Sequence, residues 1–285
     1  MYHVEYFVVN SNGRNVSMTD YGSHGNRNNT TFSVLFEAYK HFNMSKAFTF
    51  GVCTGDRDFQ TPFGRRPDIY TQIPNFAYTT VVDNFNETCP DFFFGGEPGL
   101  NIRDWDALTG NLSIVGRTNK PLINKIGWVG SVGKIPSRQL LTELSTQNSD
   151  WMDCFDVNWI GFDDSLERYT GAQYLTFQDQ VTRWKYLIDV EGQGYSARTK
   201  VLMFSGRVLF IADRPWKEWW YQGLEPWVHY VPVKRDLSDL RQNFEIVDND
   251  PDLQQKIINN SLDYARNNLR YIHAMNRWKV LIDSI

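Results

Sequence analysis

The second half of the chain repeats one order of elements: a β-branched or aromatic run, then a turn, often with glycine, and a helical pattern. Residues 125–131 (KIGWVGS) are typical of a strand and turn, and 137–148 (SRQLLTELSTQN) of the helix that follows. The order recurs with a strand at 184–192, a helix at 196–206 and a further strand at 207–213. This alternation predicts parallel strands joined by crossover helices, and therefore a doubly wound α/β unit.

The first 120 residues show a related pattern. Residues 2–10 indicate a strand, and apolar side chains three and four residues apart predict a helix over 30–45. A strand at 46–53 and another that begins at residue 75 follow. We therefore expect a second open parallel sheet in this part of the chain.

These patterns predict two lobes and a cleft. Glycine and proline between 110 and 127 favour a crossing near 115–125, so we expect an N-terminal Rossmann-like lobe at 1–120 and a C-terminal one at 121–265. Apolar spacing in the tail from residue 250 predicts two helices in series, and the last, at 266–285, is expected to pack back on the N-terminal lobe. Ligands of such sheets bind outside the carboxyl ends of the strands, so the cleft is the expected site.

Composition and charge exclude several function classes. Aromatic residues make up 15% of the chain and charged residues 22%, which indicates a folded protein able to stack flat ligands. A formal charge of −4 without a basic patch argues against nucleic-acid partners. No run approaches the roughly eighteen apolar residues of a membrane span, and the N-terminus has no basic and apolar leader. We therefore expect a soluble cytoplasmic protein.

The three cysteines suggest neither a disulfide framework nor a zinc site. Cys53, Cys89 and Cys154 lie in unrelated contexts with no C-x-x-C pair. This pattern argues against disulfides and against a zinc site, and it fits a reducing compartment.

The turn after the strand at 184–192 is the best local candidate for a ligand site. Gly192 allows a tight turn, and Ser196 and Arg198 open the predicted helix, whose N-terminal amides would seat a phosphate with the guanidinium beside it. A plain glycine turn with a surface arginine is an equal alternative. The junction at Gly130 and Ser131 resembles it, although an ordinary strand-to-helix turn explains that one as well.

Two further stretches could carry chemistry. Asp56 and Asp58 follow a predicted strand end, where a carboxylate could act as a general base, or where both could belong to a solvated turn held by nearby arginines. The residues from Phe92 to Phe94 precede Gly95 and Gly96, and they could form a wall that stacks on a sugar or a loop anchored by buried rings.

Residues 218–240 combine aromatic and charged side chains. Glu218 lies among tryptophans, where a carboxylate needs a partner such as ribose hydroxyls. Asp236, with Asp239 three residues later, is typical of a helix N-cap with an acidic first turn. Residues 227–233 alternate as a strand does, so their rings are expected to be packed.

Together, the stretches at 184–211 and 218–240 resemble the signature of glycosyltransferase family 90, which includes capsule-associated fungal proteins and animal protein O-glucosyltransferases. That family's pattern is roughly K-Y-x-x-x-x-x-G-x-x-x-S-x-R-x-K, followed by E-x-x-Y-x-x-L-x-P-W-x-H-Y-x-P-V-x-x-D-L-S. The matching residues are Lys185, Tyr186, Gly192, Ser196, Arg198, Lys200, Glu218, Tyr221, Leu224, Pro226, Trp227, His229, Tyr230, Pro232, Val233, Asp236, Leu237 and Ser238.

Weaker correspondences reach back to about residue 50. GDRDFQ is similar to the family's R-D-[FY]-P segment with Gln60 in place of the proline, which places the catalytic aspartate on Asp58, with Asp56 as its rival. FFFGGEP resembles the W-x-x-G-G segment. WVGSVGKIPSR resembles the R-G-S-R-T segment, with Val129 and Val132 where arginines are usual.

The resemblance implies a GT-B arrangement and an inverting transfer of xylose or glucose from a UDP-sugar to a hydroxyl of a glycan or glycoprotein. It implies no cofactor and no metal. Asp58 would take the acceptor's proton, and an acceptor or sugar wall would lie at Phe94, Gly95 and Gly96. The residues expected to bind the donor are Gly130, Ser131, Arg138, Gly192, Tyr195, Ser196, Arg198 and Glu218.

Two other classes remain as alternatives. A non-catalytic protein that binds carbohydrate or nucleotide sugar would share the pocket without the base. A glycosidase needs two carboxylates flanking one bond, whereas Asp56 and Asp58 would project to opposite sides of a continuing strand. The lack of a leader suggests a cytosolic or virus-encoded family member, in the latter case acting in the host cytoplasm.

Overall fold

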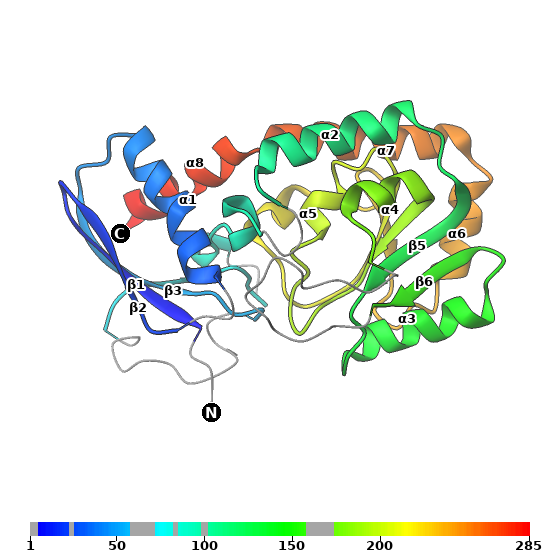
Figure 1. Cartoon of the computed structure of the whole chain (residues 1–285), viewed down its shortest axis with the longest axis horizontal. Helices are drawn as coiled ribbons and strands as arrows, with labels where there is room; N and C mark the ends of the chain where they lie inside the picture. Colours follow the sequence, from blue (N-terminus) through cyan, green and yellow to red (C-terminus); the bar gives the residue numbers. More distant parts are fainter. Residues whose placement is uncertain (1–4, 23–25, 58–71, 82–84, 98–101, 158–173) are drawn as a thin grey trace.

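The computed structural model describes residues 5–22, 26–57, 72–81, 85–97, 102–157 and 174–285. Two sheets organise them, and Figure 1 shows the N-terminal sheet at the left and the C-terminal sheet at the right. The protein is thus a mixed α/β fold.

The C-terminal sheet is fully parallel, which confirms the prediction for this half. Its strands are β5 (Ile123–Gly130), β6 (Met152–Asp156), β7 (Trp184–Asp189), β8 (Val208–Ala212) and β9 (Val231–Val233). They lie in the order β6-β5-β7-β8-β9. The central strands are covered on both faces, which is why their sequences read as continuous apolar runs.

Two separate cores cover the faces of this sheet. On one face, Tyr186 and Ile188 pack with side chains of α3 (Pro136–Gln147) and α6 (Leu240–Asp248). On the other face, Leu187 belongs to a larger core that continues into the N-terminal sheet. Strand residues alternate between the faces, so neighbouring residues enter different cores.

The N-terminal sheet differs from the prediction of an open parallel sheet. Its strands are β1 (Tyr6–Asn12), β2 (Val16–Asp20), β3 (Ala47–Cys53) and β4 (Asn75–Ala77), in the order β2-β1-β3-β4. β1 runs antiparallel to both β2 and β3, and only β3 and β4 are parallel. The parallel expectation is therefore wrong for β1.

A tight turn at residues 12–15 explains the difference. The Asn12 carboxamide accepts the backbone N–H groups of Arg14 and Asn15, and Gly13 has φ +82°. The chain therefore returns along β1 as β2, and α1 (Arg27–His41) then carries it across to β3.

The remaining helices connect the two sheets. α4 (Phe177–Arg183) packs with α2 (Trp105–Thr118), so α2 lies beside the C-terminal sheet, although the predicted boundary at 120 assigned it to the N-terminal lobe. The two predicted tail helices are α7 (Pro251–Asn268) and α8 (Tyr271–Ser284). α8 lies against α1 (Figure 1), and its Trp278 stacks on Phe50 of β3.

Three predicted elements are shorter than the sequence suggested. The helix expected at 196–206 is only α5 (Thr199–Leu202), and the strand expected at 227–233 is only β9, because Trp227 has φ +62°. Helix α6 begins after Asp239, whose carboxylate accepts the N–H of Lys234 and does not cap the helix. Among the described residues there are also short 3-10 helices, η2 (Phe85–Glu87), η3 (Phe92–Gly95) and η5 (Trp219–Gly223).

Candidate active site

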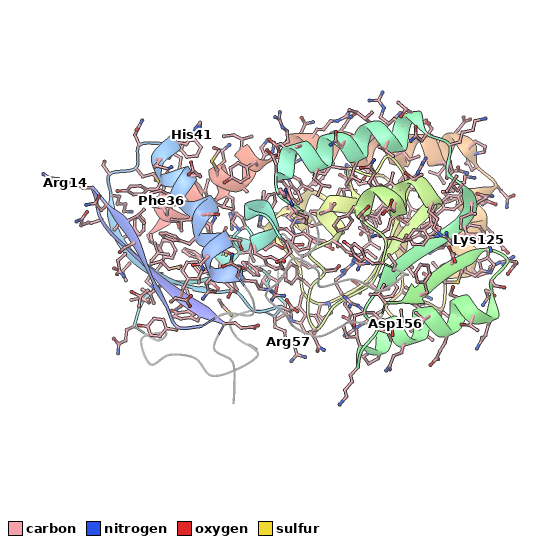
Figure 2. All side chains as sticks on the ribbon, in the orientation of Figure 1. Arg14, Phe36, His41, Arg57, Lys125 and Asp156 are labelled. Carbon is pink, nitrogen blue, oxygen red and sulfur yellow. The ribbon has the colours of Figure 1, made fainter. Side chains whose placement is uncertain are left out.

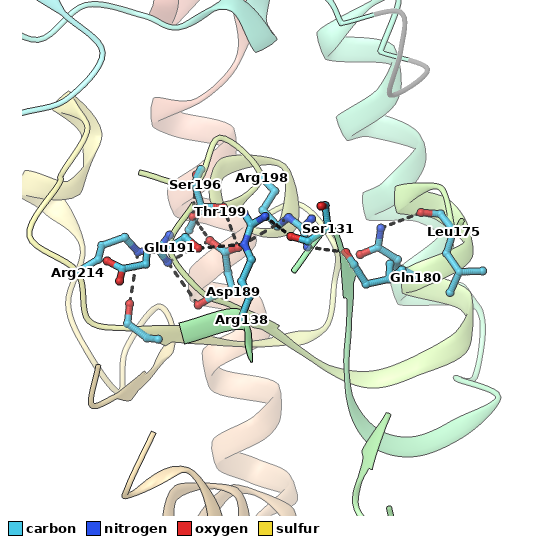
Figure 3. A network of polar contacts seen from close by, with 12 residues as sticks. Ser131, Arg138, Leu175, Gln180, Asp189, Glu191, Ser196, Arg198, Thr199 and Arg214 are labelled. Carbon is cyan, nitrogen blue, oxygen red and sulfur yellow. Dashed lines mark hydrogen bonds and ion pairs between the residues drawn. The ribbon is translucent and has the colours of Figure 1, made fainter. Parts of the chain in front are cut away.

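The order of the C-terminal strands locates a crevice. The chain passes from β5 outward to β6 on one side, whereas β7 leads to β8 on the other side. The loops after β5 and β7 therefore leave the sheet in opposite directions, and a ligand crevice forms at their carboxyl ends. Ser131 follows β5, and Glu191 to Arg198 follow β7, as Figure 3 shows.

A pocket of about 530 Å³ lies beside these loops, within the usual range for small-molecule sites. Arg57 reaches it from the N-terminal part of the chain, and Figure 2 shows this residue between the N-terminal sheet and α3. Apolar walls come from Pro136, Leu140 and Trp216.

The pocket carries more positive than negative charge. Its cations are Arg57, Lys134 and Arg235, and its carboxylates are Glu191 and Asp236. Arg235 is half exposed, and its Nη2 and Nε both donate to the carboxylate of Glu191, at 2.9 and 3.2 Å. The Arg57 guanidinium lies over the ring of Trp216, 5.5 Å from its centroid. A flat, anionic molecule would match this lining.

Arg138 and Arg198 join the two loops. Arg138 donates to the carbonyls of Ser131 and Glu191, at 2.7 and 3.1 Å. Arg198 donates to the carbonyl of Val129 at 2.9 Å, and both guanidiniums lie over the ring of Trp128. These two predicted donor-binding residues therefore hold the shape of the crevice in the structure.

Two predicted glycines make room for these contacts. A Cβ on Gly130 would lie 2.8 Å from a guanidinium nitrogen of Arg198, and one on Gly192 would lie 2.8 Å from the carbonyl oxygen of Tyr195. Gly192 lines the pocket itself. Glycine is thus required at 192, where the close atom is backbone, whereas at Gly130 a side chain would displace the end of Arg198.

The predicted phosphate seat at Ser196 is not formed by a helix. Ser196 is buried, and its hydroxyl donates to the carboxylate of Asp189 at 2.9 Å. Arg214 also binds that carboxylate, at 3.0 Å (Figure 3). The helical turn begins only at Thr199 and has four residues, so the amide array that we expected at Ser196 is missing from this stretch.

Glu218 lies in a buried charged cluster. It is 2% exposed, and its carboxylate accepts from the ammonium of Lys200 at 2.8 Å, while Asp91 accepts from the same ammonium at 2.7 Å. Burial raises the pKa of Glu218 to about 7, although Lys200 opposes this shift. The predicted need for a partner is met by Lys200, and the carboxylate does not face the pocket as a ribose site would require.

Tyr195 holds two segments together. Its side chain is 4% exposed, and its hydroxyl donates to Asp91 at 2.8 Å. Its backbone N–H donates to the carbonyl of Asp56 at 2.9 Å, and its own carbonyl accepts from Gly192. The predicted contact of this side chain with a donor is therefore replaced by internal contacts.

Of the two candidate bases, only Asp56 is among the described residues. The Asp56 carboxylate forms an ion pair with Arg27 at 2.7 Å, and the Arg27 guanidinium rests on the ring of Phe92. Asp58 lies outside the described residues. The segment that leads to it, up to Arg57, runs along the loop after β7, where Arg57 donates to the carbonyl of Gln193 at 3.1 Å.

The predicted sugar wall is buried. Phe94 is 2% exposed and packs against Trp105, so its ring offers no face to a sugar. A Cβ on Gly95 would lie 2.2 Å from the carbonyl of Thr30, and Gly96 has φ +102°. The alternative of a loop anchored by buried rings describes this stretch.

Several pocket residues, Arg57 among them, were not predicted from the sequence. Lys134 and Arg235 read as ordinary surface charges, and only the fold brings them to one cavity. Trp216 lies two residues before Glu218, so its aromatic neighbourhood was a usable signal.

Within the described part of the chain, His, Cys, Asp and Glu form no group of three or more that could hold a metal ion. No described helix is both long and apolar enough to cross a bilayer.

Comparison with known proteins adds independent findings. The sequence model of Glycosyl transferase family 90 matches residues 58–284. Protein O-glucosyltransferase 1 from Homo sapiens is 31% identical over 150 residues, which cover 52% of this chain and 38% of that protein. Protein O-glucosyltransferase 3 from Homo sapiens is 30% identical over 161 residues, 56% of this chain and 32% of that protein. The alignments thus span less than two fifths of these curated relatives.

Among solved structures, a glycosyltransferase from Rickettsia africae ESF-5 aligns with 64% of this chain and 45% of its own chain. The TM-score is 0.35 and the identity is 11%, which is too low to bear on the fold.

Proposed function

The chain belongs to glycosyl transferase family 90, and from this premise we propose that it transfers a sugar from a UDP-sugar to a hydroxyl of a glycan or glycoprotein. The observation that carries the proposal is the cationic pocket at the switch point of the parallel sheet. Its lining includes Arg57, the last described residue before Asp58.

The pocket suits a nucleoside diphosphate. Arg57, Lys134 and Arg235 would neutralise the two phosphates through charge-assisted hydrogen bonds, and Arg235 would exchange part of its contact with Glu191. The half-buried ring of Trp216 lines the pocket and provides an apolar surface for a flat base. Each of these contacts is available without rebuilding the loops, because Arg138 and Arg198 already fix them.

Glucose is the first candidate for the transferred sugar, and xylose is the second. The relatives found are named as protein O-glucosyltransferases, which favours glucose and an acceptor hydroxyl on a glycoprotein. The pocket's described lining does not distinguish the two sugars.

We propose an inverting mechanism with Asp58 as the base. Asp58 removes the proton from the acceptor hydroxyl while that oxygen attacks the anomeric carbon, and the bond from this carbon to the UDP phosphate oxygen breaks. Asp56 is the weaker candidate because Arg27 occupies its carboxylate. The two sheets would form the two lobes of a GT-B arrangement, with a mixed sheet in the N-terminal lobe.

The pocket cations would also stabilise the leaving group. Negative charge grows on the diphosphate as the glycosidic bond breaks, so Arg57, Lys134 and Arg235 would bind the transition state more strongly than the ground state. We therefore propose that no divalent metal is required.

A panel of UDP-sugars tests these proposals. We expect UDP release with UDP-glucose or UDP-xylose and an acceptor, unchanged by EDTA. Asp58→Asn should lower kcat by at least about a hundredfold and leave UDP affinity within about threefold, because it removes proton transfer and not a pocket cation. Asp56→Asn is the matched variant, in which a smaller loss is expected.

Each outcome has a distinct meaning. Silence of the wild-type protein toward every nucleotide sugar would overturn the proposed function. UDP binding without turnover, unaffected by Asp58→Asn, would instead indicate a non-catalytic binding protein. Loss of activity in EDTA that returns with a divalent ion would refute metal independence.

A further inference from the structure

Asp91 is a buried carboxylate that joins three segments. It is 1% exposed, and one of its oxygens accepts the N–H of Phe93, which caps η3. The other oxygen accepts from the Lys200 ammonium at 2.7 Å and from the Tyr195 hydroxyl at 2.8 Å. All four groups are buried, so these bonds form away from water.

Tyr195 connects Asp91 to the segment that precedes Asp58. The same residue that gives its hydroxyl to Asp91 gives its backbone N–H to the carbonyl of Asp56 at 2.9 Å. Gly194 lies so close to that carbonyl that a Cβ would be 1.7 Å from the oxygen. The loop after β7 and the segment at Asp56 are therefore held in one register.

Stability alone is a poor explanation for such a cluster. Burying an ammonium and two carboxylates costs free energy that well-packed apolar side chains would not cost. What directional hydrogen bonds add is a defined geometry. Burial and the Asp91 carboxylate raise the pKa of Tyr195, so its hydroxyl stays protonated and remains the donor.

We infer that Asp91 is a positioning residue that, through Tyr195, sets the distance between the loop after β7 and the segment at Asp56 and Arg57, which leads to Asp58. The inference rests on the proposed function, in which that loop faces the donor and Asp58 meets the acceptor. Asp91 contacts no reacting atom in this scheme. Its effect is to align the donor-facing loop with the base, Asp58. A misplacement of about 1 Å between such groups can cost about a hundredfold in rate.

Tyr195→Phe tests the inference, because it deletes the donor to Asp91 and keeps the ring. Tyr78→Phe is the matched control. The Tyr78 ring is also buried and lies 6.0 Å from that of Tyr195, but its hydroxyl bonds to Thr31 of α1, outside the loop after β7. Both variants lose one buried tyrosine hydroxyl and leave one buried oxygen without that partner.

We expect Tyr195→Phe to lower kcat for UDP-glucose turnover by about ten- to a hundredfold, with the Kd for UDP changed by less than about threefold. Tyr78→Phe should keep kcat within about twofold. Hydrogen exchange of peptides covering 192–198 gives a readout that needs no turnover. There the exchange should be faster in Tyr195→Phe than in Tyr78→Phe.

Equal kcat losses in the two variants, or a loss of kcat matched by an equal loss of UDP affinity, would overturn the inference. So would equal exchange of the 192–198 peptides. If the wild-type protein turns over no UDP-sugar, the proposed function fails, and the exchange comparison still decides whether Tyr195 and Asp91 hold the loop.

Discussion

At Gly194, the addition of a single methyl group should have a large effect on activity. It lies in the loop after β7 and faces the backbone of Asp56. Substituting alanine adds one methyl group, whose carbon would lie 1.7 Å from the Asp56 carbonyl oxygen and 2.5 Å from its carbon. Both are backbone atoms, so no side-chain rotation can relieve the contact.

The structure sets the size of the effect. Non-bonded heavy atoms need about 3.5 Å, so the two segments must separate by about 2 Å. That separation breaks the Tyr195 N–H bond to Asp56, worth about 1 kcal/mol, and overpacking adds about 1–3 kcal/mol. We expect Gly194→Ala to lower the free energy of unfolding by about 2–4 kcal/mol and kcat by about a hundredfold.

Gly116→Ala separates activity from stability. Gly116 lies in α2, and its added Cβ would also be 1.7 Å from a backbone oxygen, that of Ser205, which does not line the pocket. Urea unfolding and UDP release, measured on both variants at a temperature where both are folded, give the comparison. Full activity of Gly194→Ala, or equal activity loss in Gly116→Ala, would refute the reasoning.

Other changes have outcomes that follow from single features. The pKa of Glu218 is raised from 4.5 to about 7, so between these pH values the folded protein keeps a proton that the unfolded chain releases. The free energy of unfolding should therefore fall as the pH rises from 4.5 to 7. Glu218→Gln should remove up to about 3 kcal/mol of that fall in urea titrations, whereas an unchanged slope would contradict the shift. Burial also raises the pKa of Glu5 to about 7, so this residue should contribute to the same fall. Gly110→Ala, at an open and exposed position in α2, should raise stability by about 0.5–1 kcal/mol in the same assay. Arg207→Lys should lower Tm and cost about 2–3 kcal/mol, because one ammonium cannot replace three bonds to separate carbonyls; a Tm within a degree of wild type would refute this.

The sequence was most informative where local pattern and burial agree. The parallel C-terminal sheet followed from repeated strand, turn and helix runs, since the central strands β7 and β8 are buried on both faces and are therefore mostly apolar. Helices α1, α3, α7 and α8 followed from apolar spacing. The family resemblance, carried by residues between 185 and 238, is confirmed by the family match over residues 58–284.

Sequence patterns failed where strand pairing or a partner distant in the sequence determines the structure. Direction in the N-terminal sheet depends on the turn at Asn12 and on β2, a short and largely exposed strand with little apolar signal. The helix predicted from Ser196 shrank to one turn because the hydroxyls of Ser196 and Thr199 bind Asp189. Such contacts cannot be predicted from a local pattern, because the sequence around one residue does not identify its partner.

The sequence by itself determined the family, the parallel unit and the two loops that border the crevice. Local periodicity, glycine spacing and motif register are short-range properties, and a chain shows them without being folded. Only the tertiary structure decided that Glu218 and Tyr195 turn inward to Lys200 and Asp91, and that Lys134 and Arg235 share a pocket with Arg57. The physical reason is that a buried charge must find its partners in space, and one partner of Lys200, Asp91, lies more than a hundred residues away.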